Sequence, residues 1–143
     1  MEKITQIPSH LDQFADETAL IIIAAKQEGR IFRASNGELE MIEKFRIPTP
    51  HFSDNEALPN ERGEQHNTVQ VKIHHEYLEH FKNALHVLAP MLKPTHAYLF
   101  GPKHTVDELE HIMKPIFGAL PIKTIIGIFT EESPFELIER IMN

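Results

Sequence analysis

The chain has 143 residues, the size of one ordinary domain, and it carries 14 basic and 21 acidic side chains for a net charge of −7. That charge argues against a protein that coats nucleic acid by electrostatic attraction alone. The absence of cysteine excludes disulfides, thiolate metal sites and a cysteine nucleophile.

The start of the chain lacks a basic region followed by an apolar core, so no signal peptide is predicted. The longest apolar run, Ala19–Ala25, is too short to cross a membrane. We therefore expect a cytoplasmic protein that binds neither membrane nor DNA.

Three strands are predicted in the N-terminal third, after a polar segment. Residues 1–18 lack a sustained hydrophobic period and are predicted to be an N-terminal arm. Residues 19–23 form a β-branched run typical of a strand buried on both faces, and residues 30–34 form a second strand. Asn36-Gly37 predicts a hairpin turn into a third strand at residues 38–45, whose hydrophobic alternation is imperfect.

Residues 46–70 are predicted to be a long loop, because they are polar and contain three prolines and a glycine. A stretch of this length without secondary structure is usually functional or disordered. The loop ends in the sequence Arg62-Gly63-Glu64-Gln65-His66.

Helices alternate with strands in the second half. An apolar stripe predicts a helix over residues 71–89, stopped by Pro90. A buried strand at residues 97–100 follows, closed by Gly101-Pro102, and a second buried strand is predicted over residues 122–129.

Two capping boxes are predicted to open the remaining helices. The first is Thr105-Val106-Asp107-Glu108, whose helix is limited by Pro115, and the second is Ser133-Pro134-Phe135-Glu136. The resulting order is three strands, a loop, and then α-β-α-β-α. We therefore predict one α/β domain with a mixed sheet of about five strands, an antiparallel meander followed by parallel β-α-β units, flanked by helices.

The histidine-rich segment 74–80 does not have the spacing of a zinc protease helix. Such a helix places two histidines at i and i+4, whereas His75 and His80 are five residues apart. A solvated helix face is the interpretation that the spacing favours. We expect no metal site and no cofactor.

The strand-to-helix turn at Gly101, Lys103 and His104 has two interpretations. A turn of this kind presents free backbone N–H groups and the positive end of a helix dipole, which favour an anion or an RNA phosphate. A tight structural turn is the alternative, because Pro102 removes one donor and no phosphate-binding loop motif is present.

The order of these segments resembles the middle domain of archaeal and eukaryotic class-1 peptide release factors, their Pelota relatives and the small bacterial proteins related to that domain. The resemblance covers residues 19–143. The segments that carry it are ALIIIAAKQEGRIFRASNGELEMIEKF, RGEQ, EYLEHFKNALHVL, AYLFGPKHTVDEL and IKTIIGIF.

In release factors a Gly-Gly-Gln tip on the long loop promotes hydrolysis of peptidyl-tRNA. The resemblance matches Gly63 to the first glycine and Gln65, the candidate catalytic residue, to the glutamine. Glu64 replaces the second glycine, which removes backbone freedom and adds a charge that repels RNA phosphates. Arg62, Gly63, Glu64 and His66 are candidate binding residues around Gln65.

Three hypotheses follow from the resemblance. The first is a stand-alone, translation-associated module that binds ribosome or tRNA through residues 46–70 without classical peptide release. The second is a protein-interaction or stress-response module that keeps the fold without RNA binding. The third is a peptidyl-tRNA hydrolase in which Gln65 orients water.

The ten histidines are either scattered surface residues or a pH sensor. Their full protonation would change the formal charge from −7 to +3. Any affinity for RNA is therefore expected to rise below about pH 6.5.

Overall fold

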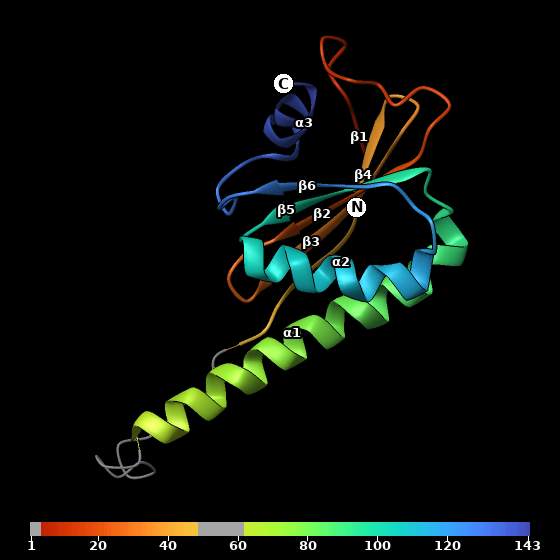
Figure 1. The fold of residues 1–143 in the computed structure, drawn as a ribbon. Coiled ribbons are helices and arrows are strands. Elements are labelled where there is room, and N and C mark those ends of the chain that lie inside the picture. The colour runs from red at the N-terminus through yellow and green to blue at the C-terminus, as the bar shows by residue number, and fades with distance from the viewer. Residues whose placement is uncertain (1–3, 49–61) are drawn as a thin grey trace.

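The computed structural model describes residues 4–48 and 62–143, and for residues 62–69 it describes only the backbone. In these ranges, six strands form one mixed sheet and three helices cover it (Figure 1). The strands are β1 (Ile4–Gln6), β2 (Ala19–Ala24), β3 (Glu28–Ser35), β4 (Glu38–Arg46), β5 (His96–Gly101) and β6 (Ile122–Ile126). The helices are α1 (Arg62–Leu92), α2 (Lys103–Phe117) and α3 (Pro134–Met142). None of these three helices is long and apolar enough to span a bilayer.

The predicted α/β class and the mixed sheet are confirmed. The strands lie in the order β1-β4-β3-β2-β5-β6. β1 to β4 pair antiparallel, whereas β2, β5 and β6 pair parallel to one another. The carboxyl ends of the three parallel strands therefore meet at one edge of the sheet.

The prediction of an N-terminal arm is wrong for the described residues 4–18. β1 pairs with β4, and Ile7, Leu11 and Phe14 that follow it are at most 5% exposed. The segment is also tied to the β3–β4 turn, where the Ile7 N–H donates to the Gly37 carbonyl at 2.8 Å. A three-residue strand and irregularly spaced core residues produce no periodic signal, so the sequence pattern did not reveal them.

The Asn36-Gly37 turn is confirmed. Asn36 and Gly37 have φ angles of 46° and 80°, the left-handed pair that a two-residue hairpin turn requires. The imperfect alternation of the next strand has a physical cause in a β-bulge. The pairing register shifts between the Ile31–Glu43 and Phe32–Met41 pairs. The extra residue moves the odd-numbered side chains of β4 from one face of the sheet to the other.

The predicted loop at 46–70 is wrong at its C-terminal end. α1 begins at Arg62, so residues 62–70 are helical, and residues 49–61 lie outside the described residues. No proline interrupts the chain between Arg62 and Ala89, and glutamate and glutamine are good helix formers. At its other end α1 continues two residues past Pro90, which has no N–H to donate to the carbonyl four residues before it, so the predicted stop at Pro90 is placed slightly too early.

The two predicted capping boxes have different outcomes. The Ser133 box is present: the Glu136 N–H donates to Ser133 Oγ at 3.3 Å, and the Ser133 N–H donates to Glu136 Oε1 at 3.2 Å. The Thr105 box is wrong, because α2 already begins at Lys103 with Pro102 as its N-cap and no side-chain cap. α2 also contains Pro115 and ends at Phe117, before Gly118.

The core lies on both faces of the sheet. On one face, α1 and α2 pack against β2 and β5 through Leu20, Leu99, Phe81, Leu85 and Leu109. On the other face, α3 and the N-terminal segment pack through Ile21, Phe100, Phe14, Leu137 and Ile138. Figure 1 shows α3 on the opposite side of the sheet from α1 and α2.

The predicted buried strand at residues 122–129 is shorter and more exposed than expected. β6 ends at Ile126 and is the outer strand beside β5, so its side chains are half-buried or exposed. Phe129 is buried beyond the strand, against Phe100. A run of isoleucines at a sheet edge cannot be told from a central strand by its sequence alone.

Candidate functional site

The residues predicted to form the tip, Arg62 to His66, lie in the first turns of α1. This end of α1 extends beyond the sheet in Figure 1. Because an α-helix rises about 1.5 Å per residue, Gln65 lies roughly 14 Å along the helix axis from His74. The structure therefore does not bring Gln65 together with Gly101, Lys103 and His104 at the β5–α2 turn. The orientation of the Gln65 side chain lies outside the described part of the chain.

The β5–α2 turn is tightly built. A Cβ atom at Gly101 would lie 2.8 Å from the Ala24 carbonyl oxygen, so this close approach to β2 requires glycine. Lys103 Nζ donates to Asp107 Oδ2 at 3.1 Å, and His104 Nε2 lies 2.9 Å from Glu108 Oε1. Both side chains are thus engaged within α2, which favours the interpretation of a structural turn.

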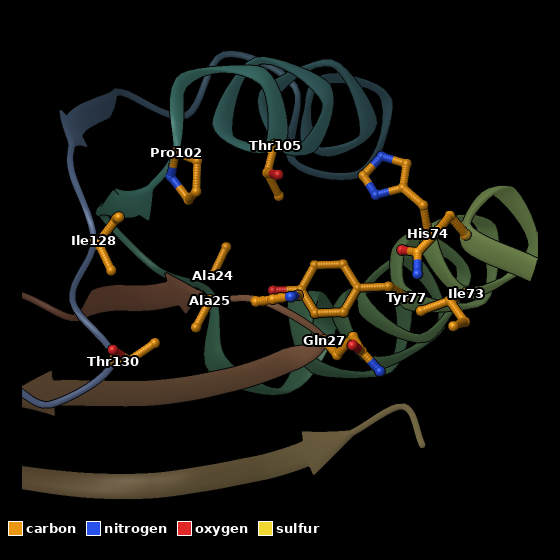
Figure 2. A pocket seen from close by; sticks show the side chains of 12 residues that line it. Ala24, Ala25, Gln27, Ile73, His74, Tyr77, Pro102, Thr105, Ile128 and Thr130 are labelled. Carbon is orange, nitrogen blue, oxygen red and sulfur yellow. The ribbon is translucent and has the colours of Figure 1, made fainter. Parts of the chain in front are cut away.

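A pocket of about 310 Å³ lies outside the carboxyl ends of the parallel strands. It is bounded by the residues that follow these strands and by α1, as Figure 2 shows. Its lining includes Ala24, Pro102, Thr105, Ile128, His74 and Tyr77. Crevices at this edge of open α/β sheets are common ligand sites. This pocket was not predicted, because its walls come from four separate segments.

Two polar side chains of the pocket are held by hydrogen bonds to backbone carbonyls. The Tyr77 hydroxyl donates to the Glu28 carbonyl at 2.7 Å, and burial raises the pKa of Tyr77, so it stays protonated at neutral pH. Gln27 Nε2 donates to the Ile47 carbonyl at 2.8 Å. Among the described lining residues there is no serine, cysteine or carboxylate, whereas Lys26, Thr105 and Thr130 supply an ammonium group and two hydroxyls.

Beside the pocket, three groups able to bind a metal meet between α1 and α2. These are the His74 and His104 rings and the Glu108 carboxylate. His104 was predicted as a binding residue, but His74 and Glu108 were not. The four-residue spacing of His104 and Glu108 is visible in the sequence, whereas nothing in it places His74 beside them.

Two of the basic residues around α1 and its neighbouring elements are paired with carboxylates rather than free to meet an RNA phosphate. Arg46 lies 4.0 Å from Glu28, and Lys103 is paired with Asp107. Lys72 is exposed on α1, and the Arg62 side chain lies outside the described residues. The described surface near α1 therefore contains cations, but two of them are already paired with carboxylates.

Neither a family model nor a curated protein matches this sequence. Among solved structures, the chain is similar to the archaeal translation termination factor aRF1 (14% identity, TM-score 0.43, 87% of this chain and 37% of that chain). It is also similar to Lmo2764 from Listeria monocytogenes, described as a candidate N-acetylmannosamine kinase (15% identity, TM-score 0.46, 88% of this chain and 56% of that chain). A further similar structure is the PilM-PilN type IV pilus biogenesis complex (11% identity, TM-score 0.46, 93% of this chain and 44% of that chain).

These likenesses are weak and concern the fold alone. Every TM-score is below 0.5, and the proteins bear unrelated descriptions. The chain spans between about one third and somewhat over half of the length of the solved chains that it matches. What those proteins bind or catalyse therefore gives no argument about this one.

Proposed function

We propose that this protein is a translation-associated module that binds ribosome or tRNA through residues 46–70 without catalysing peptide release. The observation that carries the proposal is the position of Arg62-Gly63-Glu64-Gln65, which opens the long helix that follows the antiparallel meander in the chain, with residues 47–61 between them. This is the order of segments on which the resemblance to release-factor middle domains rests. The end of α1 that carries these residues extends beyond the sheet (Figure 1).

The backbone of this segment supports binding without catalysis. Residues 62–66 are helical, and helical angles are open to every residue, so the conformational freedom of Gly63 is not used. Glu64 adds negative charge beside Gln65, which is unfavourable where RNA phosphates are dense. Gln65 remains a candidate catalytic residue of the alternative hydrolase.

Sedimentation of the tagged protein through a sucrose gradient tests the proposal. We expect the protein in ribosomal or tRNA-containing fractions, and we expect Arg62→Glu to reduce the fraction of the protein that sediments there. Lys123→Glu is the matched control, because it makes the same charge change on the outer strand β6. Absence from those fractions in both growing and stationary cells would overturn the proposal, as would equal losses from the two variants.

The alternative hydrolase is tested separately with a peptidyl-tRNA substrate. Under our proposal the wild-type protein leaves the ester bond intact. Hydrolysis by the wild-type protein that is lost in Gln65→Ala would instead assign catalysis to this residue.

A protein-interaction module is the second candidate, and the paired cations favour it. Arg46 and Lys103 each lie within 4.0 Å of a carboxylate, which reduces the positive potential that RNA would meet. A pull-down from cells distinguishes the two. Captured proteins that include no ribosomal components would support the protein-interaction module. Captured proteins that are mostly ribosomal would exclude that module.

A further inference from the structure

Two histidines and one glutamate from two helices converge at the outer surface of the molecule. His74 lies on α1, and His104 and Glu108 lie one turn apart on α2. His74 Nε2 and His104 Nε2 lie 2.8 Å and 2.9 Å from the same oxygen, Glu108 Oε1. We propose that these three side chains form a binding site for a divalent transition-metal ion of the Zn²⁺ type.

The donor set fits such an ion. Two imidazole nitrogens and one carboxylate oxygen are the protein ligands of many zinc sites that keep a fourth position open. Mg²⁺ and Ca²⁺ prefer ligand sets made of oxygen, so the two imidazoles favour a transition metal over these ions. The site is distinct from the protease-like spacing that the sequence excludes, because only one of its histidines comes from residues 74–80.

The distances between the donors allow an ion after a small adjustment. The three ligand atoms all lie within 4.8 Å of one another. Two donors of a tetrahedral zinc ion at bond lengths near 2.1 Å are about 3.4 Å apart. The nitrogen–oxygen separations of 2.8 Å and 2.9 Å would therefore widen by about 0.5 Å, and the nitrogen–nitrogen separation, at most 4.8 Å, would narrow by up to about 1.4 Å, which side-chain rotation can provide.

The backbone that carries the donors is held by the core. Ile73 and Tyr77, which flank His74 on α1, are buried, and so are Val106 and Leu109 on α2. The two imidazole rings are nearly parallel, at 21° and 5.9 Å between centroids. Ligands on well-packed helices need little reorganisation to receive an ion. Figure 2 shows the His74 ring reaching from α1 toward α2.

The site is open to ions from solvent. The His104 side chain is 83% exposed, whereas those of His74 and Glu108 are 38% and 33% exposed. His74 also lines the pocket at the sheet edge, so the bound ion would lie at the rim of that pocket. Its open coordination position would be available to water or to an anionic ligand.

A second histidine–glutamate pair, His80 and Glu43, offers a comparison with only two donors. His80 Nε2 lies 3.0 Å from Glu43 Oε2, but its ring stacks on Phe45 at 3.8 Å between centroids. Among the described residues, no second imidazole or carboxylate completes that pair into a group of three. The same two residue types therefore make an ion pair in one place and three converging donors in the other.

Calorimetric titration of tag-free, chelator-treated full-length protein with Zn²⁺ tests the proposal. We expect binding of one ion per chain at this site, and no binding of Mg²⁺. His74→Ala and His104→Ala should each weaken Zn²⁺ binding by at least about tenfold, since loss of a mere supporting partner costs that much. His75→Ala is the matched control, because it removes an exposed imidazole next to His74 on α1 and should bind as the wild type does.

A second measurement needs no variant. In the NMR spectrum of imidazole nitrogens, Zn²⁺ should shift the signals of His74 and His104 first and leave that of His80 in place. The proposal is overturned if the wild-type protein binds no Zn²⁺, if His74→Ala and His104→Ala bind as tightly as His75→Ala, or if other histidines shift first.

Discussion

The two faces of the sheet bury similar apolar residues but differ in what they carry on the outside. The helices on one face hold seven of the ten histidines, five in α1 and two in α2, and they border the pocket. α3, on the other face, holds none, and the loop before it is fixed by Arg30, which donates to the Phe129 carbonyl at 3.0 Å. The comparison indicates that the α3 face contributes packing, whereas the pocket and the group of His74, His104 and Glu108 both lie beside α1 and α2.

The largest expected effect tests whether the N-terminal segment belongs to the core. Phe14 is fully buried on the α3 face, so Phe14→Ala should lower the free energy of unfolding by about 3–5 kcal/mol. Val87→Ala, at a side chain that is 62% exposed on α1, should change it by less than about 0.5 kcal/mol. Chemical denaturation measures both. Equal small effects would mean that residues 4–18 are an arm after all.

The next effect concerns the packing of the α1 face. A Cβ atom at Gly29 would lie 2.5 Å from ring atoms of both Phe45 and Phe81. Gly29→Ala should therefore cost about 1–3 kcal/mol of unfolding free energy through overpacking. Gly118→Ala is a useful contrast: nothing lies within 4 Å of an added Cβ, and only its φ of 67° opposes the change. A neutral Gly29→Ala in urea denaturation would show that α1 can move away from β3.

A smaller effect separates the two helix starts. Ser133→Ala removes the side-chain cap of α3 and should cost about 1 kcal/mol in thermal or urea unfolding. Thr105→Ala should cost less than about 0.5 kcal/mol, because α2 begins at Lys103 and has no side-chain cap. If Thr105→Ala proves as costly as Ser133→Ala, the helix begins at Thr105 in solution, as its sequence suggested.

The smallest effect is a pH dependence of folding stability, which comes from the Glu132–Arg140 pair on the α3 face. Arg140 Nε donates to Glu132 Oε2 at 2.7 Å, and this bond lowers the pKa of Glu132. A carboxyl whose pKa is lower in the folded state stabilises the fold above its ordinary value of 4.5 and loses that contribution as pH falls through the folded value. Glu132→Gln should thus slightly lower the urea midpoint at pH 7 and leave it unchanged once Glu132 is protonated. A difference that persists in acid would contradict this.

Local signals in the sequence predicted the features that depend on neighbouring residues. Asn36-Gly37 specified its turn, and Ser133 with Glu136 specified a capped helix start. The alternation of helices and strands in the second half was enough to predict the parallel part of the sheet. In each case the physical cause lies within a few residues of the signal.

Features made by distant contacts were missed. β1 exists because β4 offers it an edge, and Phe14 is buried because α3 and the β3–β4 turn surround it. Glu108 matched a capping position, but its carboxylate contacts the His74 and His104 rings. The pocket and the histidine–glutamate cluster both need α1 and α2 side by side, which no local pattern specifies. The role predicted for Gln65 stays a prediction.

The pairing pattern of the sheet has a consequence for how the chain folds. The contact of β1 with β4 closes a short loop, as in the Thr5–Leu39 hydrogen bond across 34 residues. The start of the β2–β5 pairing closes a longer one, marked by the Thr18–Thr95 bond across 77 residues. Closing the longer loop costs more chain entropy, so we expect the antiparallel meander to form first. Pulse-labelled hydrogen exchange should then protect amides of β3 and β4 before those of β5 and β6, and the reverse order would contradict it. During synthesis, a large part of the sheet could thus be assembled while the metal-binding groups on α2 are still to be made.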